Sequence, residues 1–254
     1  MSFDAVYDLL RITEYTAKKM LRSSNIPTKY SYASILVLLY LVFALFLPLD
    51  NAFFYLITLL SGFIGSTILT IYLIMGVYLF DQHLELTKYY YLNLRDLLKN
   101  IKNEKELENL NSAIEKLLLI DKIGIEYSPV TVIPAYTSLL LLHDKVYMFL
   151  FLAIYMIVCS LVVREIIIRY NEHVEKENMI EKELSKITSS QAKDYDTLPY
   201  CKIGWIILLM ITFSVVLIYV INKVFKGINE HLAIHRSNYE YVKKYVVKIT
   251  HINY

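Results

Sequence analysis

Residues 53–80 read FFYLITLLSGFIGSTILTIYLIMGVYLF and contain no charged side chain. As a helix this stretch is about 42 Å long, which exceeds the roughly 30 Å hydrocarbon core of a bilayer. Residues 31–48, 146–163 and 203–221 form three more uncharged apolar runs, and 56% of the 254 residues are hydrophobic. An ordinary soluble domain is less apolar than this. We therefore predict an all-α fold, a polytopic membrane helix bundle with four or five spans and amphipathic extramembrane helices.

The number of spans depends on residues 124–142, which are uncharged after Glu126 but contain Pro129 and Pro134. This stretch is compatible with a short fifth span, a re-entrant element or a buried irregular segment. Lys and Arg residues are frequent before the first apolar run and missing from the turn at 49–52, so the N-terminus is predicted to be cytoplasmic. The side of the C-terminal tail changes with the number of spans.

Apolar and polar stretches alternate along the chain and predict seven segments. They are an N-terminal amphipathic cytoplasmic segment (1–30), a membrane hairpin (31–83), cytoplasmic amphipathic helices (84–123), a second membrane segment or hairpin (124–173), a charged loop (174–200), a last membrane helix (201–224) and a basic amphipathic tail (225–254).

Three similar tetrapeptides suggest a weak internal repeat of a helical hairpin. They are DQHL at 81–84, NEHV at 171–174 and NEHL at 229–232. Each places its histidine (His83, His173 or His231) within ten residues of the end of an uncharged apolar run. The three histidines are therefore predicted to occupy equivalent, membrane-proximal positions.

The histidines are the best candidates for specific chemistry. His231 and His235 are four residues apart and share one helix face, as a two-histidine metal site requires. His83 and His173 would supply further ligands if the repeats converge. However, the stretch HLAIH lacks the internal glutamate of the HExxH zinc-protease motif. We therefore expect no cofactor and no bound metal, with His231 and His235 as the candidate ligands if there is one, and expect the histidines mainly to hydrogen-bond their neighbours.

Two amphipathic stretches match when they are aligned on His83 and His231, with apolar residues at heptad spacing. Such seams can pack on each other, on a partner subunit, or on the membrane and the bundle. We predict that they form a partner surface, represented by Leu84, Tyr91, Leu98, Leu232, Tyr239 and Val246. The glutamates between residues 172 and 183 alternate with lysines and are typical of a solvated charged helix.

Several classes of enzyme and transporter are disfavoured. The sequence has no nucleophile elbow, no glycine-rich phosphate loop and no CxxC pair. The four apolar runs contain no Asp, Glu, Lys, Arg or His, whereas ion-coupled transporters normally place such residues at mid-membrane. We therefore predict a protein that is not an enzyme and has no catalytic residues.

Glutamine occurs at only two positions, cysteine is rare and lysine is abundant, which is typical of a thermophilic archaeon. In size, spanning-helix content and composition the chain resembles the polytopic membrane protein of the crenarchaeal DNA-import (Ced) system. The resemblance covers the whole architecture but no diagnostic motif, so it transfers no residue roles. It implies a channel that works with a partner ATPase.

We accordingly predict a multi-pass cell-membrane protein that acts as a scaffold or pore-forming subunit of a translocation complex, with DNA import or exchange as its process. Membrane lipids, further copies of the chain or other membrane subunits, and an ATPase are the expected partners, and nucleic acid is a candidate without a motif. The alternatives are a small-solute or ion channel or transporter, and a viral or accessory membrane protein.

Overall fold

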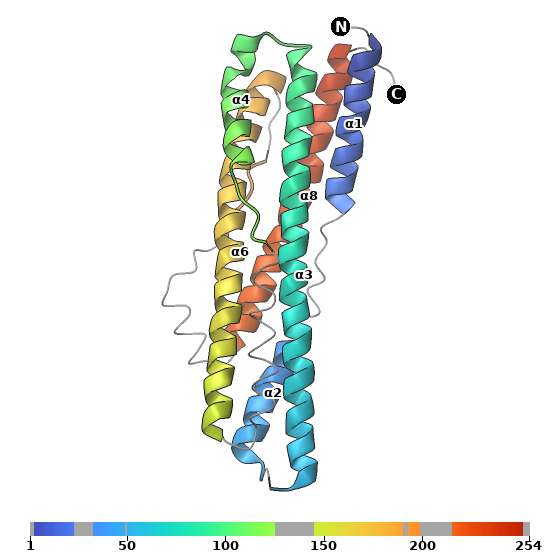
Figure 1. The fold of residues 1–254 in the computed structure, drawn as a ribbon. Coiled ribbons are helices and arrows are strands. Elements are labelled where there is room, and N and C mark those ends of the chain that lie inside the picture. Colours follow the sequence, from blue (N-terminus) through green and yellow to red (C-terminus); the bar gives the residue numbers. More distant parts are fainter. Residues whose placement is uncertain are drawn as a thin grey trace.

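The computed structural model describes residues 3–22, 33–48, 50–124, 145–189, 193–198 and 215–250. Within these ranges every regular element is an α-helix, which confirms the all-α prediction. The helices are α1 (Phe3–Arg22), α2 (Ala33–Phe46), α3 (Ala52–Lys99), α4 (Glu104–Leu118), α6 (Lys145–Thr188) and α8 (Val215–Thr250). They run along one long axis, and α1 begins at the same end of the molecule at which α8 ends (Figure 1).

Helix α3 is the spine of the bundle and runs along its whole length (Figure 1). It begins after Asn51, whose side chain accepts a hydrogen bond from the Phe53 N–H at 2.9 Å. The predicted boundary between a membrane hairpin (31–83) and cytoplasmic helices (84–123) does not coincide with a helix end, because α3 continues without a break to Lys99. Residues 77–99 contain no glycine or proline, so nothing in the sequence interrupts the helix after the apolar run.

Helix α6 corrects a second boundary, because the predicted charged loop at 174–200 is helical up to Thr188. Val174, Ile180 and Leu184 from this stretch are buried at helical spacing, so it has an apolar face to pack. The helix ends at Thr188, and the next residue, Ser189, has a positive φ of 51°. Residues 125–144, which contain the ambiguous fifth-span segment, lie outside the described residues.

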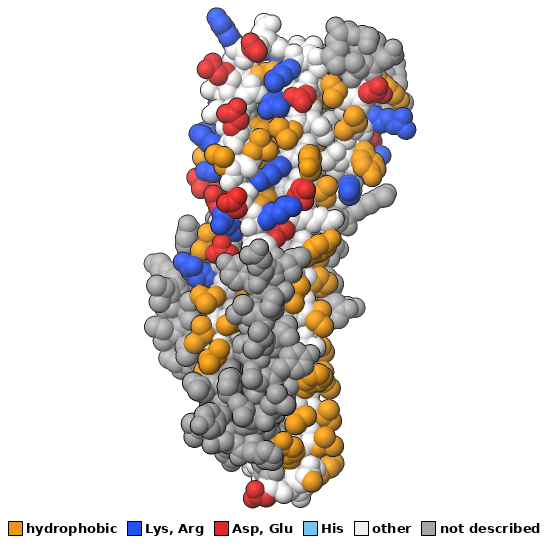
Figure 2. All heavy atoms as spheres, in the orientation of Figure 1, with side chains coloured by type: hydrophobic (Ala, Val, Ile, Leu, Met, Phe, Trp, Pro, Cys, Tyr) orange, Lys and Arg blue, Asp and Glu red, His pale blue; other side chains and the backbone are white. Residues whose placement is uncertain are grey.

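The surface divides into an apolar half and a charged half along the long axis (Figure 2). Large apolar side chains such as Phe46, Phe53, Leu56 and Ile71 are exposed on α2 and on the first part of α3. Lys, Arg, Asp and Glu cover the other half, which α1, α4 and the later parts of α3, α6 and α8 build (Figure 2). Among the described helices, α3 alone has the length and apolar composition of a membrane span.

Each half has its own core. In the apolar half the ring of Phe225 on α8 reaches the backbone of α3, because a Cβ atom added to Gly76 would overlap that ring. Glycine is therefore needed at position 76 to leave room for the Phe225 ring. In the charged half α4 returns along the bundle, and the chain after it is fastened to α3. There the Asp81 carboxylate accepts hydrogen bonds from the N–H groups of Ile123 (2.8 Å) and Gly124 (2.9 Å).

The predicted partner seam lies inside the chain. Its six residues are each at most 8% exposed: Leu84, Tyr91, Leu98, Leu232, Tyr239 and Val246. All except Leu232 belong to the core of the charged half, together with residues of α4 and α6. The heptad pattern is thus used for packing within one chain. In this arrangement the six side chains offer no surface to a partner, which corrects the partner-seam prediction.

Candidate metal centre

Four histidines from three helices meet in the interior of the charged half. His83 comes from α3, His173 from α6, and His231 and His235 from one face of α8. One ring nitrogen of each lies within 4.8 Å of the others, and none of the four residues is more than 2% exposed. The structure therefore brings together the three histidines of the repeat and His235 of the HLAIH stretch.

A carboxylate lies beside three of the four rings. Glu177 is one turn after His173 on α6 and is fully buried. Its Oε2 is 3.2 Å from Nε2 of His173 and 2.9 Å from Nε2 of His231, and its Oε1 is 2.8 Å from Nε2 of His235. His83 completes the group, because its Nε2 is 3.3 Å from Nε2 of His173. Four imidazole rings and one carboxylate therefore form one buried cluster.

The Glu177–histidine contacts are at ion-pair distances, and the His83–His173 contact is a hydrogen bond. Both oxygens of Glu177 and the Nε2 atoms of His231 and His235 are buried without a hydrogen-bond partner among the described residues. In metal sites, nitrogen and oxygen ligands lie about 2.0–2.2 Å from an ion such as Zn²⁺, which places neighbouring ligand atoms roughly 3 Å apart. The separations between 2.8 and 3.3 Å match that spacing.

The protonation state also suits a cation. Burial lowers the pKa of His83 well below its ordinary value and that of His173 to about 3, and it lowers the pKa of His231 as well. Burial alone would raise the pKa of Glu177, but the attraction of His173, His235 and His231 holds it well below the ordinary value. Neutral imidazoles and an ionised carboxylate are the forms that bind a metal ion.

An outer layer of polar groups surrounds the cluster. Glu181, one turn after Glu177, accepts a hydrogen bond from the Tyr91 hydroxyl at 2.8 Å and a longer one from Tyr195 at 3.5 Å. Burial raises the pKa of Glu181 to about 7. The Tyr195 hydroxyl is also 3.1 Å from Nδ1 of His235. An outer group that contacts a ligand directly, as Tyr195 contacts His235, can orient that ligand in a metal site.

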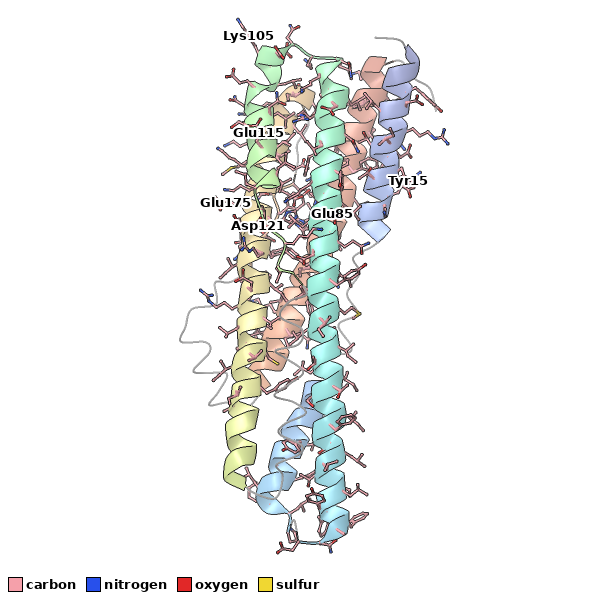
Figure 3. All side chains as sticks on the ribbon, in the orientation of Figure 1. Tyr15, Glu85, Lys105, Glu115, Asp121 and Glu175 are labelled. Carbon is pink, nitrogen blue, oxygen red and sulfur yellow. The ribbon has the colours of Figure 1, made fainter. Side chains whose placement is uncertain are left out.

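The four histidines can be picked out from the sequence, but the buried acids Glu177 and Glu181 are not predicted. The prediction of a solvated charged helix is wrong for Glu177 and Glu181, because they are 0% and 4% exposed. Their neighbour Glu175 fits that assignment, since it is exposed and projects outward from α6 (Figure 3). The available signal was spacing, because Glu177 follows His173 by four residues and so shares its helix face.

No family model, curated protein or solved structure matches this chain. Its chemistry therefore follows from the donor set. Imidazole and carboxylate donors without a thiolate suit Zn²⁺, Fe²⁺, Ni²⁺ and Cu²⁺. Full burial of the ligands is typical of a site that holds an ion, whereas catalytic sites keep a position open.

Proposed function

We propose that this chain is a membrane-anchored metal-binding protein that holds one divalent transition-metal ion. Its ligands are His83, His173, His231, His235 and Glu177. A single observation carries the proposal: five buried side chains from α3, α6 and α8 bring their polar atoms together, and both Glu177 oxygens and the Nε2 atoms of His231 and His235 make no well-aligned hydrogen bond among the described residues.

Burying these polar groups together is unfavourable in free energy. A buried polar group without a partner costs about 1–3 kcal/mol, and a buried charge costs more. Both oxygens of Glu177 and two imidazole nitrogens share this problem at one place. A cation at their centre would satisfy all of them at once. It would also link three helices that are far apart in sequence, so that binding energy becomes folding energy.

The division of the surface into an apolar half and a charged half supports a membrane location. Exposed apolar side chains on α2 and the first part of α3 suit contact with lipid, and the charged half begins at Asp81. We keep the multi-pass arrangement of four or five spans, with the N-terminus in the cytoplasm. The ion would then lie just outside the bilayer, because His83 follows the last apolar residue, Phe80, by three positions.

Metal binding is compatible with a part in a larger membrane assembly. A scaffold or pore-forming subunit that works with an ATPase in DNA import stays a prediction from size and composition. The packing of Gly76 against Phe225 fills the space between α3 and α8 with side chains. That packing favours a solid anchor over a pore within one chain.

The test is a direct measurement of bound metal. The protein would be purified in mild detergent with a tag that contains no histidine, stripped with a chelator and dialysed against Zn²⁺. Elemental analysis should then find one ion per chain. Replacing Glu177 by Gln keeps the shape but removes the charge, and we expect at least a tenfold loss of Zn²⁺ affinity.

The matched control is Glu175→Gln, which removes the same charge from the exposed face of α6 (Figure 3). It should bind Zn²⁺ like the wild type. A wild-type protein that retains no ion, or a Glu177→Gln protein that binds as tightly as the control, would refute the metal centre.

A further inference from the structure

An extended segment, residues 193–198, lies against α6 and α8 beside the metal centre. Three asparagine side chains hold it, and each one bonds both the N–H and the carbonyl of a single segment residue. Asn238 holds Lys193 (both distances 3.1 Å), Asn178 holds Tyr195 (2.8 and 3.0 Å) and Asn171 holds Leu198 (2.7 and 2.9 Å). The segment is therefore fixed in position and register by side chains alone.

The register places Tyr195 on the histidines. Its ring centroid is 4.4 Å from that of His231 and 4.9 Å from that of His235, and the residue is 3% exposed. Its hydroxyl is 3.1 Å from Nδ1 of His235 and also accepts a hydrogen bond from the side chain of Asn238 at 3.3 Å. The hydroxyl proton can then go to Glu181, 3.5 Å away.

These contacts indicate where the ring proton of His235 lies and which group each hydrogen bond donates to. Nε2 of His235 faces Glu177 at 2.8 Å, so coordination through Nε2 leaves the ring proton on Nδ1. That Nδ1–H can donate to the Tyr195 oxygen, which accepts from two groups and donates to one. By contrast, the Nδ1 atoms of His83, His173 and His231 have no hydrogen-bond partner in the described part of the chain.

We propose that Tyr195 is a positioning residue of the metal centre. Tyr195 fixes His235 in the tautomer that presents Nε2 to the ion. The asparagine-held segment holds Tyr195 in the position where it can do this. This inference rests on the metal centre proposed above. In known metal sites, loss of an outer partner of a ligating histidine lowers metal affinity by about 10- to 100-fold. The same loss is expected here.

The experiment uses the full-length protein in detergent with Co²⁺ as the probe, because the visible absorption of bound Co²⁺ reports the geometry of its ligands. Tyr195→Phe keeps the ring on the histidines and removes only the hydroxyl. We expect a 10- to 100-fold weaker affinity for Co²⁺ and a changed visible spectrum. Asn178→Ala, which releases the backbone of Tyr195 but keeps its hydroxyl, should change both readouts in the same direction.

The matched control is Tyr91→Phe. It removes the other hydroxyl that donates to Glu181, and that hydroxyl bonds the carboxylate at 2.8 Å. The control should keep the wild-type spectrum and an affinity within about threefold of wild type. Equal binding by Tyr195→Phe and wild type, or an equal loss in both tyrosine variants, would overturn the positioning role alone. Failure of the wild type to bind Co²⁺ would instead overturn the metal centre and this inference with it.

Discussion

The strongest pH-dependent prediction concerns Glu181, a buried carboxyl group next to the metal ligands. The side chain is 4% exposed, and burial raises its pKa from 4.5 to about 7 despite the hydroxyl bond from Tyr91. The unfolded chain keeps the ordinary value. Between pH 4.5 and about 7 the folded protein therefore holds a proton that the unfolded protein releases.

The sign follows from this difference. A group that binds more protons in the folded state makes stability fall as pH rises, so Glu181 contributes most below pH 4.5 and its contribution is lost as pH rises through about 7. One pKa unit corresponds to about 1.4 kcal/mol, so the whole effect is roughly 3 kcal/mol. Glu181→Gln removes the titration while its amide oxygen can still accept from Tyr91. Relative to wild type, the variant should gain about 3 kcal/mol of unfolding free energy between about pH 4 and pH 8.

The measurement is equilibrium unfolding of both proteins in mild detergent with a chelator, followed by far-UV circular dichroism across this pH range. Taking the difference between the two proteins cancels the buried histidines, whose lowered pKa values act with the opposite sign. A difference that stays constant with pH, or that moves in favour of wild type as pH rises, would show that Glu181 is not held protonated by burial.

Two further predictions concern contacts that α3 makes with other parts of the chain. Gly76→Ala forces a methyl group into the ring of Phe225 and should cost about 1–3 kcal/mol by overpacking; a melting temperature equal to that of wild type would contradict the contact between the Phe225 ring and Gly76. Asp81→Ala removes the acceptor of two backbone N–H groups after α4 and should cost about 1–3 kcal/mol, with faster proteolysis near residues 119–124; unchanged digestion would argue against this attachment.

Helix formation and the importance of the histidines could be predicted from the sequence, because both depend on local spacing. The uncharged run at 53–80 predicts a helix wherever it lies, and His231 and His235 share a face on any helix. The histidine repeat pointed to equivalent positions at the membrane-proximal ends of apolar runs. His83 and His173 in fact meet at an Nε2–Nε2 distance of 3.3 Å.

The helix ends and the buried acids could not be predicted in the same way. The segment boundaries predicted after residues 83 and 173 follow the fall in hydropathy, but a change of environment does not break a helix that contains no glycine or proline. Burial of Glu177 depends on where α3 and α8 lie relative to α6. In the sequence alone its surroundings of Glu and Lys resemble those of exposed Glu175.

The asparagine-held segment has a consequence for recognising related chains. Because side chains of α6 and α8 grip the segment through its backbone, substitutions at Asp194, Asp196 or Thr197 leave those bonds intact. The constraint falls instead on the helices, as N-x-H-x3-E-N-x2-E at 171–181 and H-x3-H-x2-N at 231–238. Divergent relatives would share these two spaced patterns, together with a histidine just after a long apolar run, even where the rest of the sequence has drifted beyond alignment.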